Sequence, residues 1–193
     1  MIIVVVIGID MKARLIVTMD CNRKCAGCCN SYSKIMSGAK KINSILEIPK
    51  KCTEVLITGG EPLLYPEKTL DIISEVKKRF PDGKIYLYTA FYNKTKLDDI
   101  LSIINGIHYT VHAEATKLDL KGFYRMQKHL NGYDISKRLY IDPVCKIPVL
   151  VDYYNLWDVI GVDKWKTETE LLKLQEGGLP EGETLYILDK ESK

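Results

Sequence analysis

The sequence predicts an α/β protein whose mostly parallel sheet forms an incomplete barrel of five or six strand–helix units. Two observations favour this class: short apolar runs typical of strands alternate with amphipathic segments typical of helices, and tight-turn residues separate them. The third observation is the length of 193 residues. A full eight-fold barrel takes roughly 250 residues, so we expect a shorter barrel within a single domain spanning residues 1–193.

The predicted strands are near-continuous apolar runs, as expected for strands buried on both faces. They cover residues 14–19, 54–58, 84–89, 107–112 and 138–141, with a sixth candidate at 184–188. Residues 2–7 are also apolar, but no basic segment precedes them and no cleavage site follows, so they do not resemble a signal peptide. We expect residues 1–12 to contribute an extra edge strand, unless Met11 is the true start.

Three segments carry the pattern of helices. Residues 68–80 place apolar side chains on one face, and a proline and glycine end the segment. Thr95 and Asp98 form a potential capping box before a second helix, and Gly106 is its expected end. Thr167 and Glu170 form a potential capping box before a third helix. The part of the chain from about residue 143 to 193 is the least defined.

Composition and charge exclude some classes of function. The formal net charge is only +3, which gives no reason to expect nucleic-acid binding. No apolar stretch is long enough to cross a bilayer, so no membrane partner is expected. Four of the six cysteines fall within nine residues. Such crowding without a secretion signal favours metal binding in a reducing compartment, and we expect a cytoplasmic protein.

The crowded cysteines form a C-x3-C-x2-C pattern of Cys21, Cys25 and Cys28, directly after the first predicted strand. Thiolates are soft ligands that suit zinc and iron–sulfur clusters. Three thiolates on one loop can hold a cubane of four irons and leave one iron open, and an open site indicates chemistry. Structural zinc and inert buried thiols are the alternatives. Cys29, next to Cys28, and the lack of a nearby histidine disfavour zinc.

A second motif follows the second predicted strand, where Gly59, Gly60, Glu61 and Pro62 stand in a row. Two glycines at a strand end allow the backbone to approach a ligand closely, and the Glu61 carboxylate could accept hydrogen bonds from an amine. A tight turn is the alternative explanation. The motif by itself is therefore weak evidence for a ligand-binding site.

Together, these two motifs resemble the pattern of the radical S-adenosylmethionine superfamily over about residues 13–115. The similarity is greatest to the small activating enzymes of anaerobic ribonucleotide reductases, in which a glycine precedes the third cysteine and an asparagine follows shortly after it, as Gly27 and Asn30 do here. The resemblance implies a partial (β/α)6 barrel. It also implies that Cys21, Cys25 and Cys28 ligate a 4Fe-4S cluster.

The resemblance further implies the activity and the cofactor-binding residues. The cluster would cleave S-adenosylmethionine reductively to methionine and a 5′-deoxyadenosyl radical, which abstracts hydrogen from a substrate. Gly59, Gly60, Glu61 and Pro62 would hold the amino group of the methionine moiety. Asn30 is a further cofactor contact by the same resemblance. A reductant such as flavodoxin or ferredoxin and a glycyl radical enzyme are the implied partners.

Barrel active sites lie at the carboxyl ends of the strands, and this rule nominates further residues. Thr89 ends the third predicted strand and could contact the cofactor. His112 and Glu114 end the fourth and are the candidate catalytic residues, although His112 could equally be a hydrogen-bonded structural histidine. Other functions remain open: radical modification of a small molecule, peptide or nucleobase, or a non-catalytic iron–sulfur electron carrier.

Overall fold

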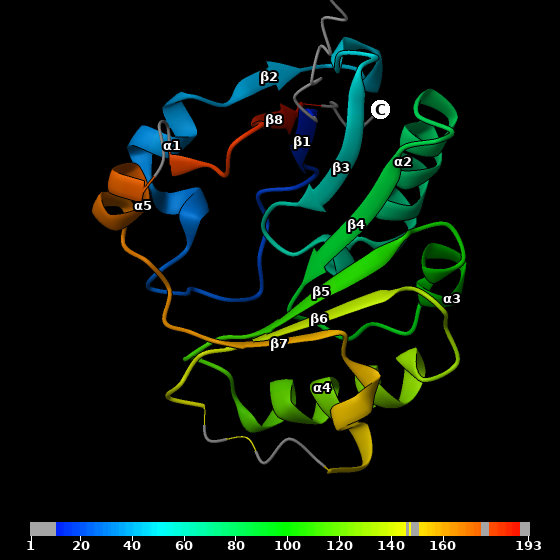
Figure 1. Cartoon of the computed structure of the whole chain (residues 1–193), viewed down its shortest axis with the longest axis vertical. Coiled ribbons are helices and arrows are strands. Elements are labelled where there is room, and N and C mark those ends of the chain that lie inside the picture. The colour runs from blue at the N-terminus through cyan, green and yellow to red at the C-terminus, as the bar shows by residue number, and fades with distance from the viewer. Residues whose placement is uncertain (1–10, 146, 148–150, 175–177, 190–193) are drawn as a thin grey trace, which may run out of the picture.

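The protein is an α/β structure in which eight parallel strands form one curved sheet, shown as a computed structural model in Figure 1. The structure describes residues 11–145, 147, 151–174 and 178–189. The sheet order is β2-β8-β1-β3-β4-β5-β6-β7, so the last strand lies beside the first. The strands are β1 (Met11–Ile16), β2 (Lys40–Ile42), β3 (Cys52–Thr58), β4 (Lys84–Thr89), β5 (Gly106–Val111), β6 (Ser136–Ile141), β7 (Val159–Val162) and β8 (Glu183–Leu188).

Within the described residues, five α-helices accompany the sheet, and several 3-10 turns connect the elements. The helices are α1 (Ser33–Ser37), α2 (Pro66–Arg79), α3 (Leu97–Leu101), α4 (Lys117–Leu130) and α5 (Glu168–Leu174). In Figure 1, α2, α3 and α4 cover the outer face of the sheet, while α1 and α5 lie together beside the β2–β8 end. None of the described helices is long and apolar enough to cross a membrane.

Alternation along the strands divides the sheet into an apolar outer face and a more polar inner face. The outer face packs with the helices into one core, in which Leu15, Ile57, Leu87, Ile107 and Leu139 are fully buried. The inner face carries polar and aromatic residues, and the register aligns Tyr88, His108 and Arg138 on adjacent strands. The outer core therefore holds the sheet together, and the inner face is free to carry chemistry.

The six predicted strands are all present, but β2 and β7 were not predicted. β2 is only three residues long, and β7 has only four residues, Val-Ile-Gly-Val, none of which is buried. Short edge strands owe their conformation to pairing with a neighbour, here β8 and β6, rather than to their own sequence. Residues 1–10, which hold most of the expected extra edge strand, lie outside the described residues.

The helix predictions were partly wrong. Lys96, which precedes α3, has φ 56° and a left-handed conformation, so Thr95 cannot cap that helix. Asp98 instead accepts hydrogen bonds from Tyr133 and His129. The long helix α4 was not predicted, although Thr116 and Asp119 form a capping box at its N-terminus. By contrast, the predicted capping box of Thr167 and Glu170 is present before α5.

The parallel topology places the chemistry-bearing residues at one edge of the sheet. β1 leads into the cysteines, β3 into Gly59, and β4 and β5 into Ala90 and His112. Because all strands point the same way, these four strand ends lie at the same edge although they come from distant parts of the sequence.

Candidate functional site

The cysteine loop (residues 17–29) leaves the carboxyl end of β1 and carries Cys21, Cys25 and Cys28. All three are free thiols; Cys21 is exposed, and the other two are partly buried. The amide of Cys28 donates to the carbonyl oxygen of Cys25 over 3.2 Å, which makes a tight turn between these two residues. One short surface loop therefore presents three thiols.

The three thiols are close enough to affect one another. The pKa of the Cys25 thiol is raised to about 12, first by burial and then by the charges of Glu114, Cys21 and Cys28. Among the described residues, no three Cys, His, Asp or Glu side chains converge on a point that would hold a single metal ion. A four-iron cluster presents separate corners to its ligands, and three thiolates on one loop fit three of those corners.

The glycine segment (residues 59–62) lies directly against the cysteine loop. The Gly60 amide donates to the Thr18 carbonyl oxygen over 2.7 Å, and the Glu61 amide donates to that of Asp20 over 2.8 Å. Gly59 has φ +138°, and a Cβ there would lie 2.3 Å from the Thr18 oxygen; at Gly60 it would lie 2.0 Å from that of Asp20. Neither position can accept a side chain, so the glycine pair is needed to join the two motifs backbone to backbone.

The side chain of Glu61 is bonded inside the protein rather than directed to solvent. It is 2% exposed, and one carboxylate oxygen accepts from the Leu63 amide (3.0 Å) and the Thr89 hydroxyl (2.6 Å). The other oxygen accepts from the Ala90 amide at 2.9 Å. Burial raises the pKa of Glu61, and these hydrogen bonds oppose that rise. Glu61 and Thr89 thus anchor the end of β4 to the glycine segment, which Pro62 continues as the first residue of a 3-10 turn.

Arg23 extends this network into the cysteine loop. Its side chain is 8% exposed, and one nitrogen lies 3.9 Å from the buried Glu61 carboxylate. The guanidinium also donates to the carbonyl oxygen of Ala90 over 2.7 Å and pairs with Asp119 at the start of α4. The neighbouring Lys24 is exposed. Arg23 lies between the first two cysteines, so this residue fixes the loop to the ends of β3 and β4, a role that its position in sequence does not reveal.

The two candidate catalytic residues reach the same loop from the end of β5. The Glu114 carboxylate accepts from the Ala26 amide over 2.9 Å, and this bond lowers its pKa. His112 stacks on Trp165, with ring centroids 5.0 Å apart, and its Nδ1 atom is buried without a hydrogen-bond partner. Burial lowers the pKa of His112, so its ring is neutral near pH 7. The fold therefore joins Glu114 to the cysteine loop directly, and places His112 on Trp165, which lies against Gly27 of that loop.

Comparison with known proteins agrees with this geometry. Residues 8–122 match the family described as 4Fe-4S single cluster domain, which is more than half of the chain. The chain belongs to this family. Its expected cofactor is accordingly a 4Fe-4S cluster, and the free thiols of the cysteine loop are the residues that fit it.

No curated protein matches the chain. Among solved structures, it is similar to BtrN, which was crystallised in complex with AdoMet and 2-DOIA, with a TM-score of 0.40 and 18% sequence identity. The alignment covers 58% of this chain and 55% of BtrN, so the chain spans little more than half of that protein.

A C-terminal strap (residues 163–168), which lies outside the residues that match the family, contacts the cysteine loop. A Cβ on Gly27 would lie 2.7 Å from the Cβ of Trp165, so the loop and the strap are in close contact. The Tyr32 hydroxyl donates to the Lys166 carbonyl oxygen over 2.9 Å, and the Lys34 amide donates to the Glu168 carboxylate over 2.7 Å. The segment that was least defined in sequence thus becomes part of the site.

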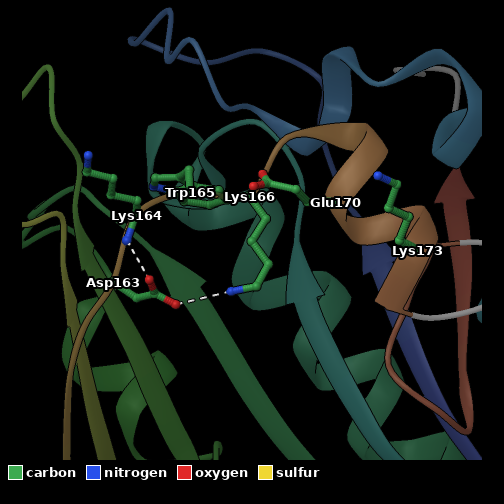
Figure 2. Close-up of a pocket in the computed structure, with 6 residues that line it drawn as sticks. All are labelled: Asp163, Lys164, Trp165, Lys166, Glu170 and Lys173. Carbon is green, nitrogen blue, oxygen red and sulfur yellow. Dashed lines mark hydrogen bonds and ion pairs between the residues drawn. The ribbon is translucent and has the colours of Figure 1, made fainter.

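The strap also lines an open pocket of about 390 Å³, shown in Figure 2. Its walls are formed by Asp163, Lys164, Trp165, Lys166, Glu170 and Lys173. Asp163 and Lys166 form an ion pair of 3.1 Å, drawn as a dashed line in Figure 2. Trp165 forms the side that faces the cysteine loop, because it also contacts His112 and Gly27.

Asn30, Cys52 and Cys145 lie outside the cysteine loop. Asn30 follows it in a 3-10 turn, and its side-chain oxygen is 3.9 Å from the Cys29 sulfur. Cys52 is buried at the start of β3, with its sulfur 3.2 Å from the Met11 carbonyl oxygen. Cys145 donates to the carbonyl oxygen of His112 at 2.9 Å, so it lies near the end of β5.

Proposed function

We propose that the chain is a radical S-adenosylmethionine enzyme. The observation that carries the proposal is the backbone contact between the cysteine loop and the glycine segment. An electron carrier needs only the thiolates that hold its cluster. A glycine segment bonded to the backbone of the loop that carries those thiolates gives an adjacent place for a ligand amine, which a carrier would not need.

In this proposal each part of the site has a defined task. Cys21, Cys25 and Cys28 hold the cluster, which when bound supplies the electron for reductive cleavage of S-adenosylmethionine to methionine and a 5′-deoxyadenosyl radical. The backbone of the glycine segment holds the amino group of the methionine moiety. Glu61 acts by fixing that segment, because its carboxylate is buried and already accepts three hydrogen bonds.

Residues near the carboxyl ends of the strands have supporting tasks in this proposal. Thr89 supports Glu61 through their 2.6 Å hydrogen bond, and Asn30 lies beside the third cysteine. His112 offers a neutral ring to the nucleoside or substrate, and Trp165 covers that ring and keeps water from it. Glu114 holds the cysteine loop through the Ala26 amide.

The deciding experiment is reductive cleavage by the anaerobically reconstituted chain. With dithionite and S-adenosylmethionine, we expect release of 5′-deoxyadenosine, measured by chromatography, together with iron and sulfide bound to the protein. Cys25→Ala should lose both, whereas Cys52→Ala, which removes a buried thiol outside the loop, should keep both. An intact cluster that releases no 5′-deoxyadenosine would instead favour an electron carrier, and zinc without iron would favour a structural zinc module.

A glycyl radical enzyme is the first candidate for the substrate, on the basis of the resemblance to the activating enzymes of anaerobic ribonucleotide reductases. An exposed Cys21 would allow a flavodoxin or ferredoxin to approach the cluster. A gene for an anaerobic ribonucleotide reductase next to that of this chain, and a glycyl radical signal in electron paramagnetic resonance on mixing the two proteins, would support this candidate.

A small-molecule substrate is the second candidate, and one observation favours it. The inner face of the sheet carries Arg138, whose Nε atom is buried and has no hydrogen-bond partner. A protein loop offering a glycine brings no negative charge to such a cation, whereas a small acid does.

A further inference from the structure

An aromatic layer lines the inner face of the sheet. Tyr88, His108 and Arg138 are aligned across β4, β5 and β6. His108 is 6% exposed and stacks on Tyr88, with ring centroids 4.1 Å apart. On the other side, the ring of Tyr140 is 6.0 Å from that of His108 and 37% exposed. The layer is therefore packed at its centre and open to solvent at Tyr140.

Arg138 is a cation without a counter-charge in this layer. Arg14, on the same face, forms a 2.8 Å ion pair with Glu183. In the part of the chain that the structure describes, Arg138 forms no ion pair, and its buried Nε atom has no hydrogen-bond partner. Burial and the charges of Arg138 and Arg14 lower the pKa of His108 to about 3, so His108 is neutral and makes no difference to the charge balance at pH 7.

A buried N–H donor without a partner costs stability, and a ligand oxygen that accepts from it removes that cost. The planar guanidinium matches the two oxygens of a carboxylate or phosphate. We propose that Arg138 binds a carboxylate or phosphate group of a small-molecule substrate on the inner face of the sheet. That this molecule is a substrate rests on the proposed function.

The distance across the sheet separates this group from the methionine moiety of S-adenosylmethionine. β6 is three strands away from β3 in the sheet order, which corresponds to about 14 Å at the usual spacing of neighbouring strands. A methionine carboxylate held beside the cysteine loop and glycine segment would lie toward β1 and β3, three strands from β6. This separation favours a second molecule as the source of the anion, and competition with S-adenosylmethionine tests that assignment.

The test uses the full chain with its cluster reconstituted, and inorganic phosphate and succinate as probes. The ring signals of His108 in NMR spectra report binding, because His108 lies beside Arg138 in every variant. We expect saturable shifts of these signals in the unmodified chain and at least tenfold weaker affinity in Arg138→Gln. Arg138→Lys, which keeps the charge but loses the planar group, should lie in between. The matched control is Arg125→Gln, an exposed arginine on α4, and its affinity should stay within twofold.

Three results would overturn the proposal. The first is the absence of a saturable shift, and the second is an equal loss of affinity in Arg125→Gln, which would indicate general charge screening. The third is that phosphate competes with S-adenosylmethionine and that Arg138→Gln no longer binds S-adenosylmethionine. This result would assign the anion to S-adenosylmethionine itself. The same titrations are repeated on the metal-free chain, where anion binding at Arg138 does not depend on the cluster. The proposed function is tested separately by the release of 5′-deoxyadenosine.

Discussion

Replacing Gly60 with alanine should separate the cysteine loop from the glycine segment. A Cβ at this position would lie 2.0 Å from the Asp20 carbonyl oxygen, a backbone atom that no side-chain rotation can move away. An ordinary contact requires the loop to move by more than about 1 Å. The shift would weaken the hydrogen bonds from the Gly60 and Glu61 amides, which are 2.7 and 2.8 Å long.

The expected size of the effect follows from these bonds. Each backbone hydrogen bond contributes about 0.5–1.5 kcal/mol, so losing both should lower the free energy of unfolding by about 1–3 kcal/mol. A misplacement of about 1 Å at a reacting centre costs about a hundredfold in rate. We therefore expect Gly60→Ala to fold with reduced stability and to lose most of the release of 5′-deoxyadenosine, even where it retains iron.

Thermal unfolding of the metal-free chain, iron analysis and the cleavage assay measure the three parts of this prediction. The control is Gly132→Ala, because a Cβ at Gly132 would have no atom within 4 Å and its φ is not positive. That variant should match the unmodified chain in all three measurements. If Gly60→Ala cleaves S-adenosylmethionine at the unmodified rate, the joined backbones are not what positions the cofactor.

Two further predictions concern the inner face and the strap. Because the pKa of His108 in the folded chain is about 3 and lies below its unfolded value, stability should fall by up to about 1.4 kcal/mol per pH unit below about 6.5. His108→Phe should flatten this dependence in denaturant titrations from pH 7 to 5, and an unchanged slope would show that another group causes it. Trp165→Ala should raise the alkylation rate of Cys28 in the metal-free chain, because the strap would release the Gly27 backbone. Mass spectrometry measures this rate. The control Tyr154→Ala, a change at an exposed side chain, should leave the rate unchanged. An equal rate in both variants would show that the strap does not cover the loop.

The fold was largely predictable because its strands are strong local signals. The six apolar runs correspond to β1, β3, β4, β5, β6 and β8, because the outer-face residues of each strand are apolar and buried in the core. β2 and β7 were not predictable in this way, because short strands are set by the neighbours with which they pair. α4 could have been found, since its capping residues and the apolar positions Phe123, Met126 and Leu130 carry the usual helical spacing.

The sequence by itself identified the thiols and the glycine pair, because ligand chemistry and backbone freedom are properties of residue type and spacing. Their relation was decided by tertiary structure: parallel pairing of β1 with β3 brings Thr18 and Asp20 against Gly59 and Gly60. The same holds for Arg23, which could have been a solvated loop residue. Folding buries it beside Glu61 and Asp119, since only the assembled end of β3 and start of α4 provide the carboxylates that offset its charge.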